Sequence, residues 1–260
     1  MGLEYVKRLS AIGYNVIIAA LPGRPGEVSS PSEVALMMKK EYPEQDFFPV
    51  EIDLARTQAG DELFAEIERE RPGAFVEVLI NNAGFISIKH FRDIDEETVK
   101  KEILLHNVTT VTLCHKFLPA MSARGCGYVL NISSLTAWLP YPFISIYSAT
   151  KAFNRCFTRA LRSEYRSSGV EVATVYFGAV DTPLYKLSPS RRSLMRKLGV
   201  MITPGEAACK ALDMLFAGRS GLMPGLVNKL AYLFCPVILP RPVVVLIDKI
   251  ITKRLKLDKK

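Results

Sequence analysis

Residues 127–151 read GYVLNISSLTAWLPYPFISIYSATK, and this stretch decides the fold. Its first part, residues 128–134, is an apolar run that ends in two serines and predicts a buried parallel strand. A loop follows, and then a helix that carries Tyr147 and Lys151. Because these two residues are four positions apart, they share one face of the helix, about 6 Å apart along its axis. The stretch therefore predicts that Ser134, Tyr147 and Lys151 meet in one place.

These three residue types suit proton transfer to or from an oxygen atom. The ammonium of Lys151 favours the phenolate form of Tyr147, which lowers the pKa of the phenol from about 10 towards the working pH. Such a tyrosine can give a proton to a carbonyl oxygen or take one from an alcohol. Ser134 can hydrogen-bond the same oxygen where charge develops. The set predicts chemistry on a ketone or a secondary alcohol.

A Tyr-x-x-x-Lys pair alone is weak evidence, because a chain with 10 Tyr and 34 Lys plus Arg contains such a pair by chance, on a solvated helix face. Here Asn107 and the tetrapeptide Asn81-Asn82-Ala83-Gly84, which follows another apolar run, accompany the pair. Together they resemble the short-chain dehydrogenase/reductase family from Gly2 to about residue 225. The stretch is most similar to the branch that reduces 3-oxoacyl chains and 17-oxosteroids. The resemblance implies an α/β fold with a doubly wound (Rossmann) parallel sheet in three α/β/α layers.

The resemblance also implies a role for each site residue. Tyr147 supplies the proton, Lys151 lowers the pKa of Tyr147 and binds the nicotinamide ribose, Ser134 orients the oxygen, and Asn107 connects the proton relay. The positions that match the family's cofactor-binding residues are Gly2, Arg24, Asp53, Asn81, Ala83, Gly84, Tyr147, Lys151, Gly178 and Thr182. Phe177 replaces a proline that usually precedes the glycine at 178, which affects the rigidity of that loop.

The N-terminal part departs from the family pattern. Residues 2–12 predict a helix and residues 15–20 a buried strand, but in the family this helix follows a first strand and a Gly-rich turn that holds the pyrophosphate. The chain starts at what resembles the last glycine of that turn, Gly2. In the strand order 3-2-1-4-5-6, the missing strand 1 leaves two facing edges unpaired. We expect a shortened version of a longer protein; the rival is a variant that has lost dinucleotide binding.

The end of the strand at residues 15–20 favours NADP over NAD. Ala20 and Leu21 stand where the family's NAD users carry an acid, and Arg24 is close enough to meet a 2′-phosphate. A solvated loop arginine is the alternative for Arg24. Asp53 directly follows the next predicted strand, residues 47–52, at the position of the family's adenine-contacting acid.

The remaining segments complete the predicted domain and its substrate lid. Helices are expected at residues 31–42, 61–70, 95–120, from 147 to Gly169 and from 204 on, and strands at 76–80 and 170–176. The stripe Phe153, Phe157 and Leu161 fits either a two-fold dimer interface or packing on the sheet. Residues 183–203 combine apolar and basic side chains, which predicts a lid for a lipophilic substrate with an acidic head; a plain amphipathic surface helix is the alternative.

Composition sets the domain count and the expected partners. With 260 residues of which 49% are apolar, the chain can bury one α/β domain, residues 1–219, followed by a tail, residues 220–260. The formal charge is +8, yet no zinc spacing or aromatic-basic interleaving predicts nucleic-acid binding. The tail is apolar with a basic end and too short in its uncharged runs to span a membrane. The tail predicts peripheral membrane contact. The alternative is that it packs beside the active site or against a second subunit.

The cysteines predict a reducing compartment, and the histidines predict no metal site. Neither type shows a CxxC pair or metal-ligand spacing, and no secretory signal precedes the first helix. We therefore expect reduced core cysteines, structural histidines and a cytoplasmic homo-oligomer that can associate with a membrane. They are Cys114, Cys126, Cys156, Cys209, Cys235, His90, His106 and His115. The sequence predicts an NADP-dependent oxidoreductase for a lipophilic ketone or alcohol. The alternative is a non-catalytic, membrane-associated binding protein on the same fold.

Overall fold

The computed structural model describes residues 1–23, 30–138, 141–182 and 188–224. Its helices are α1 (Gly2–Ala11), α2 (Pro31–Glu41), α3 (Ala59–Glu70), α4 (Glu96–Ile103), α5 (Thr109–Arg124), α6 (Ser145–Glu164), α7 (Pro189–Lys197) and α8 (Pro204–Phe216). Its strands are β1 (Val16–Ala20), β2 (Phe47–Glu51), β3 (Val78–Asn81), β4 (Gly127–Ser134), β5 (Val170–Phe177), β6 (Ala179–Val180), β7 (Met201–Ile202) and β8 (Gly221–Leu222). Strands and helices alternate along most of this order, as in βαβ units.

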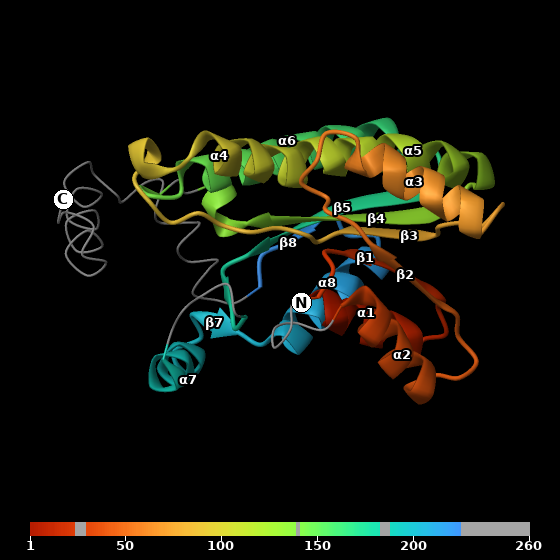
Figure 1. The fold of residues 1–260 in the computed structure, drawn as a ribbon, viewed down its shortest axis with the longest axis horizontal. Helices are drawn as coiled ribbons and strands as arrows, with labels where there is room; N and C mark the ends of the chain where they lie inside the picture. Colours follow the sequence, from red (N-terminus) through yellow and green to blue (C-terminus); the bar gives the residue numbers. More distant parts are fainter. Residues whose placement is uncertain (24–29, 139–140, 183–187, 225–260) are drawn as a thin grey trace.

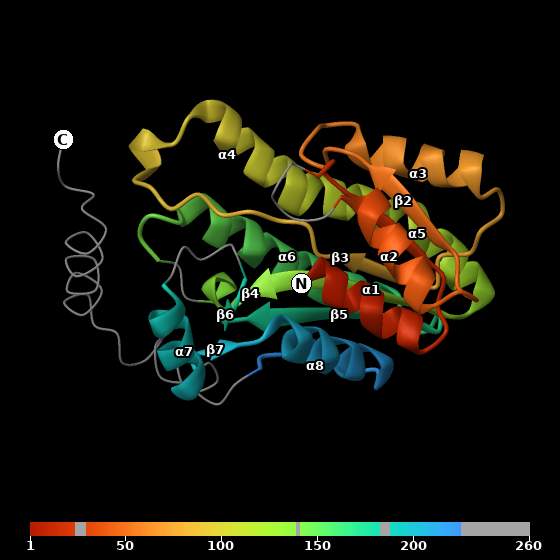
Figure 2. The ribbon, with the colours of Figure 1, turned by 60° about the horizontal axis from the view of Figure 1, so that its bottom comes forward.

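Helices cover both faces of a parallel sheet. All paired strands run parallel, and the four-stranded part has the order β3-β4-β5-β8. Figure 1 shows α3, α4, α5 and α6 on one face and α1, α2 and α8 on the other; Figure 2 gives the second view. β4 and β5 are almost entirely buried, which explains why their sequences are nearly continuous apolar runs. The predicted three-layer, doubly wound α/β fold is confirmed.

The sheet is interrupted between β1 and β3. β1 pairs with β2 in a separate two-stranded ladder, and within the described residues no strand pairing joins β1 to β3. Both strands nevertheless contribute to the same hydrophobic clusters: Ile17 and Leu79 pack in one, Val16 and Ile80 in the other. Their side chains are mostly half-buried, unlike those of β4 and β5. The expected pair of facing, unpaired edges is therefore present where strand 1 of the family order would lie.

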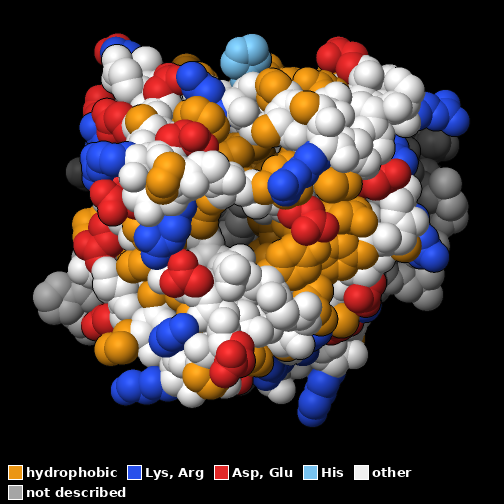
Figure 3. Space-filling model, turned by 90° about the vertical axis from the view of Figure 1, so that its right-hand side faces the viewer, with side chains coloured by type: hydrophobic (Ala, Val, Ile, Leu, Met, Phe, Trp, Pro, Cys, Tyr) orange, Lys and Arg blue, Asp and Glu red, His pale blue; other side chains and the backbone are white. Residues whose placement is uncertain are grey.

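Three hydrophobic clusters hold the layers together, one of which packs α1 and α2 against β1 and β2. On one face of the sheet, α3 and α5 contribute Leu63, Leu118 and Met121; on the other, α1 and α8 contribute Leu9 and Leu212. Figure 3 views the side of the molecule at which β3 and β4 begin and shows a hollow with hydrophobic side chains gathered beside it. Apolar surface is thus exposed on this side of the interrupted sheet.

Several predicted boundaries need correction. The helix expected at residues 95–120 is α4 and α5 joined by a π-helical turn, Leu104–Val108, and it extends to Arg124. α6 ends at Glu164 rather than at Gly169, because the Ser168 hydroxyl and N–H both donate to the Tyr165 carbonyl and form a turn. Gly169 has φ +74°, and this left-handed residue leads directly into β5.

The prediction that the cysteines are core residues is wrong for most of the described cysteines. Cys114, Cys126, Cys156 and Cys209 are free thiols, but only Cys114 is buried among these four. Cys156 lies on the outward face of α6, and Cys126 lies in the turn before β4. Within the described ranges, no group of side chains could hold a metal ion, and no helix is long and apolar enough to cross a membrane.

Some predictions fall on residues outside the described ranges. These are Arg24, residues 183–187 of the lid, and residues 225–260 of the tail. The described part of the lid, residues 188–203, forms α7 and β7 and ends at Thr203, the residue before α8. The predicted start of α8 is confirmed: Pro204 is its first residue, and the Thr203 hydroxyl caps it by accepting the Glu206 N–H.

Candidate active site

The site is built where β4 ends and α6 begins. The side chains of successive strand residues point to opposite faces, so Ser133 and Ser134 diverge. Ser133 Oγ donates to the Lys151 carbonyl at 2.9 Å and so anchors α6 to β4. Ser134 is buried, and its Oγ accepts the Thr136 N–H at 3.2 Å. One serine therefore fixes the helix, and the other remains at the carboxyl end of the strand.

Tyr147 and Lys151 form the expected pair on α6. The Lys151 Nζ lies 5.5 Å from the centroid of the Tyr147 ring. Lys151 is only 5% exposed, and its Nζ donates to the Ile132 carbonyl at 3.0 Å. Tyr147 is half-buried at the start of the same helix. The helical spacing places a buried ammonium beside a phenol that is partly open to solvent.

The charge of Lys151 reflects two opposing influences. Burial lowers the pKa of Lys151, because an ammonium is less well solvated in the interior than in water. The nearby carboxylate of Glu102 on α4 raises that pKa. These two influences together determine the fraction of Lys151 that is protonated beside the Tyr147 ring.

Asn107 lies in the π-helical turn and is bound to α6. Its Nδ2 donates to the Thr150 carbonyl at 3.0 Å and to Asn154 Oδ1 at 3.3 Å. The turn separates α4 from α5 and directs both His106 and Asn107 into the interior. Single π-helical turns of this kind are frequent at functional sites. The structure thus brings Asn107 to the residue directly before Lys151.

A line of polar side chains ties the tetrapeptide at residues 81–84 to the same helix. Asn81 Nδ2 donates to Asn131 Oδ1 at 2.7 Å, which links β3 to β4. Asn131 Nδ2 donates to Thr158 Oγ1 at 2.9 Å, and Thr158 Oγ1 donates to the Asn154 carbonyl at 2.6 Å. The Asn81 amide thus braces two neighbouring strands. These buried groups satisfy one another, which fixes the relative position of β3, β4 and α6.

Gly84 lies directly over the lysine. A Cβ atom at this position would lie 2.8 Å from His106 Nε2 and 3.8 Å from Lys151 Nζ. Only glycine therefore fits, and Ala83 beside it is exposed. The backbone here leaves a shallow cradle above Lys151 that a larger side chain would fill.

His106 is a site residue that the sequence reasoning treated as merely structural. Its Nε2 accepts the Phe85 N–H at 3.2 Å, so in the neutral ring the proton is on Nδ1, which lies 2.9 Å from Thr150 Oγ1. Its ring centroid is 5.7 Å from that of Tyr147. Burial, followed by the charge of Lys151, lowers the pKa of His106 well below its usual value. The position of His106 directly before Asn107 was the available signal.

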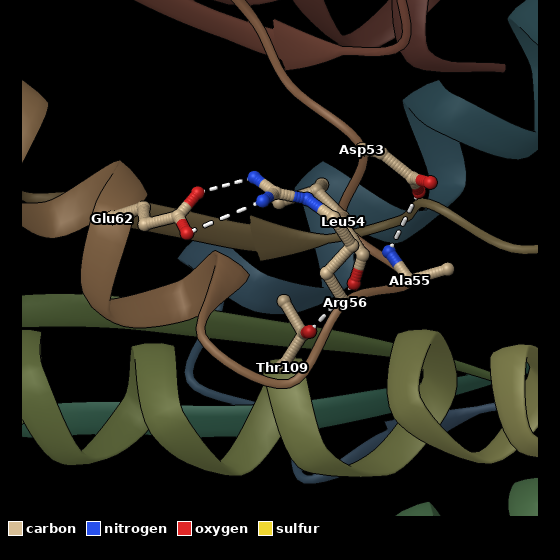
Figure 4. Close-up of polar contacts among 6 residues, drawn as sticks. All are labelled: Asp53, Leu54, Ala55, Arg56, Glu62 and Thr109. Atoms are coloured by element: carbon tan, nitrogen blue, oxygen red, sulfur yellow. Dashed lines mark hydrogen bonds and ion pairs between the residues drawn. The ribbon is translucent and has the colours of Figure 1, made fainter.

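Asp53 lies at the end of β2, on the other side of the interrupted sheet. Figure 4 shows its Oδ1 accepting the Ala55 N–H at 2.9 Å. It also shows Thr109 Oγ1, from the start of α5, donating to the Leu54 carbonyl at 2.7 Å. Thr109 is buried and lies two residues after Asn107, so it joins the Asp53 loop to the helix of the site. Sequence reasoning missed this threonine, because a lone hydroxyl in a helix carries no pattern.

Other predicted cofactor residues lie around this edge. A Cβ on Gly2 would be 3.5 Å from Asn82 Nδ2, so the start of α1 lies beside the loop that follows β3. Gly178 and Thr182 follow β5, and the Thr182 N–H donates to the Val180 carbonyl at 2.8 Å. The structure thus groups Gly2 with the 81–84 loop and leaves Gly178 and Thr182 on a neighbouring loop.

The residues present fit two ends of a dinucleotide. Asp53 stands at a strand end suited to the adenosine, and Gly84, Tyr147 and Lys151 form a cradle suited to a nicotinamide ribose. For the pyrophosphate between them, the described residues offer the first turn of α1, whose backbone N–H groups can face an anion.

A doubly wound parallel sheet with these polar groups at its carboxyl edge defines an α/β protein of the dinucleotide-binding class. The model of one family, described as short chain dehydrogenase, matches residues 1–192. The chain belongs to this family.

The sequence relatives carry two kinds of name, one of a reductase and one of a dehydrogenase. The chain is 36% identical over 131 residues to the very-long-chain 3-oxoacyl-CoA reductase of Mus musculus, covering 49% of this chain and 42% of that protein. It is 30% identical over 192 residues to that of Homo sapiens, covering 72% and 58%. Its identity to 17-beta-hydroxysteroid dehydrogenase type 3 of Rattus norvegicus is 34% over 136 residues, covering 50% and 44%. The chain spans about half the length of these curated relatives.

Solved structures agree on the fold. A 7beta-hydroxysteroid dehydrogenase superposes with a TM-score of 0.78 at 22% identity, covering 93% of this chain and 90% of that one. A short-chain dehydrogenase from Sphingobium yanoikuyae, in complex with NADPH, gives 0.71 at 22% identity, covering 99% and 91%. At this identity the likeness supports the architecture alone.

Proposed function

We propose that the protein is an NADP-dependent oxidoreductase that interconverts a ketone and a secondary alcohol on a lipophilic substrate. One observation carries the proposal: the Lys151 Nζ lies 5.5 Å from the Tyr147 ring centroid. Lys151 lies under the Gly84 cradle, and its Nζ donates to the Ile132 carbonyl near the carboxyl end of β4, where sheets of this kind bind ligands.

The residues of this chain divide the acid-base work. Tyr147 donates a proton to the carbonyl oxygen, and the Lys151 ammonium makes the phenol acidic enough to do so. Ser134 holds the same oxygen by a hydrogen bond, and Asn107 connects Lys151 to the proton relay. When bound, NADPH supplies the hydride.

Tyr147→Phe tests these roles most directly. It removes the acidic hydroxyl and keeps the ring, so we expect turnover to fall by about a hundredfold or more while dinucleotide binding is kept. Tyr165→Phe is the matched control, because Tyr165 packs against the core at the far end of α6. NADPH oxidation measures turnover, and fluorescence titration with NADPH measures binding. Unchanged turnover in Tyr147→Phe would contradict the assignment.

The names of the relatives and the residues of the lid support the proposed substrate class. The mouse and rat relatives are named for 3-oxoacyl-CoA and 17-beta-hydroxysteroid substrates, both of which are lipophilic. NADP as cofactor agrees with the lack of an acid at Ala20 and Leu21, both of which are exposed after β1. A screen of NADPH and NADH oxidation against acyl-chain, steroid and sphingoid ketones identifies substrate and cofactor together.

The proposed organisation has a catalytic domain, residues 1–219, with a lid at 183–203 and a tail at 220–260 that contacts a membrane surface from the cytoplasm. A homo-oligomer agrees with the apolar surface of α6, where Phe153 is 45% exposed and stacks on Phe157. Phe157 and Leu161 of the same stripe pack in the core, so only its first part is free for a partner. Light scattering with wild type and Phe153→Ser tests this interface.

The alternative function is non-catalytic binding on the same fold. The interrupted sheet is the observation behind this alternative, because no strand pairing among the described residues joins β1 to β3. NADPH titration separates the two functions: a binding protein of this type takes up no dinucleotide, whereas the oxidoreductase does.

A further inference from the structure

Glu102 is a buried carboxyl group beside the site that the proposed reaction does not use. It lies on α4, four residues before His106, and only 1% of its surface is exposed. Within the described part of the chain, nothing donates a hydrogen bond to its buried Oε1. Burial raises the pKa of Glu102 to about 7, because a carboxylate is poorly solvated in the interior, and the charge of Lys151 acts against this rise.

Lys151 is the matching cation. It is buried on α6, against which α4 packs. An ammonium has three N–H donors, and the Ile132 carbonyl takes one of them. Each of these side chains senses the charge of the other, and Glu102 is the one anionic group in the described ranges that acts on Lys151.

The other groups that face Lys151 carry no negative charge. His106, from the π-helical turn, is kept neutral because burial lowers its pKa. Tyr147, on the same helix as Lys151, presents the face of its ring, and Gly84 covers the Nζ without a side chain. On α4 itself, Lys100 and Lys101 pair with Glu96 and Glu97 at the surface. Among the described carboxyl groups, Glu102 is thus the one placed to act on the charge of Lys151.

We propose that Glu102 is a positioning residue whose carboxylate is the counter-charge that keeps the Lys151 ammonium protonated beneath Tyr147. The inference deepens the proposed function, since the catalytic consequence depends on Tyr147 acting as the acid. If Glu102 loses its charge, Lys151 gives up its proton more readily, and the phenol loses the charge that makes it acidic. Turnover then suffers most at high pH.

Glu102→Gln removes the charge and keeps the shape, and Glu97→Gln is the matched control, because the Glu97 side chain is 69% exposed on the same helix. The primary measurement is the pH titration of the Lys151 side chain by NMR of lysine labelled with ¹³C at Cε. The resonance is assigned by its absence in Lys151→Met. We expect the midpoint of Lys151 to move to lower pH in Glu102→Gln, to stay in place in Glu97→Gln, and to return towards wild type in Glu102→Asp. An unchanged midpoint in Glu102→Gln overturns the inference.

Turnover gives the second readout. The ratio of the rate at about pH 9 to that at about pH 7 should fall roughly threefold to tenfold in Glu102→Gln, the effect of a midpoint shift of about half to one pH unit. If wild type turns over no ketone, the proposed function fails, while the NMR titration still decides the role of Glu102. If Glu102→Gln does not fold, the wild-type titration tests the inference. The Lys151 resonance should then show a second inflection at the pH where Glu102 takes up its proton. A titration curve without this second inflection overturns the inference.

Discussion

The two serines that end β4 have different partners and therefore different expected roles. Ser133 is bonded to the backbone of Lys151, whereas the Ser134 hydroxyl accepts only a loop N–H among the contacts described. Sequence reasoning assigned Ser134 to the site from its place at the strand end. It could not separate the two hydroxyls by partner, because the partner of Ser133 lies 18 positions away in the chain.

We therefore predict different effects for the two alanine variants. Ser134→Ala should lower kcat by about 10² to 10³-fold with little change in thermal stability, because a hydrogen bond to the developing charge is lost. Ser133→Ala should lower the unfolding free energy by about 1 kcal/mol, because a buried hydrogen bond is lost. Ketone reduction and urea unfolding measure the two effects. Equal losses of kcat in both variants would contradict the division of roles.

Residues that belong to a motif could be predicted from the sequence. Residues that only contact a motif in the folded chain could not. Tyr147, Lys151, Asn107 and Asn81 stand at recognisable spacings, and the structure groups them through α6 and β4. Thr109 and Glu102 carry no such spacing. Their contacts arise only when α4 and α5 pack against the rest of the domain, which no local pattern encodes.

Among the elements, α7 is joined to the loop after β6 by ion pairs to Asp181. Asp181, after β6, pairs with Arg192 Nη1 at 2.7 Å and with Arg196 Nη1 at 3.3 Å, both from α7. The Asp181 side chain is 12% exposed, so these pairs are better shielded from solvent than most pairs at the surface. One carboxylate thus links the loop that carries Thr182 to the helix of the proposed lid.

Asp181→Asn should loosen α7 and weaken substrate binding. We expect KM for a lipophilic ketone to rise severalfold while kcat changes less, because the lid binds the substrate and not the reacting oxygen. Trypsin should also cut faster after Arg191 or Arg192. The control is Glu96→Gln, a paired carboxylate at 81% exposure on α4. Unchanged KM and proteolysis in Asp181→Asn would show that α7 is held by other contacts.

Element types were predictable and several ends were not. Helix and strand periodicity identified each predicted segment that the structure describes, since amphipathic patterns reflect burial on the sheet. The end of α6 was misplaced, because Gly169 is the usual stop residue and the turn made by Ser168 and Tyr165 ended the helix earlier. The π-helical turn was not predicted, because it adds no distinctive residue type to the sequence.

For the molecule as a whole, the interrupted sheet leads to a prediction about stability. A segment of five or six β-branched residues and a Gly-rich turn, added ahead of Met1, should fill the place between β1 and β3 and pair with both. We expect the unfolding free energy to rise by roughly 2 to 5 kcal/mol, because backbone groups gain partners and apolar side chains are covered. Thermal unfolding with and without NADPH measures this. The control segment carries proline at alternate positions and cannot donate to the ladder; equal stability of the two would contradict the prediction.

The separate β1-β2 ladder also bears on the affinity for an elongated ligand. Asp53 follows one ladder, while Ser134 and Asn81 end strands of the other, so no continuous backbone network sets the distance between them. Side-chain packing and the link from Thr109 to Leu54 hold the two halves together. A dinucleotide that binds both halves must therefore offset the entropy cost of fixing them relative to each other. Its observed affinity is lower than its intrinsic affinity by that cost.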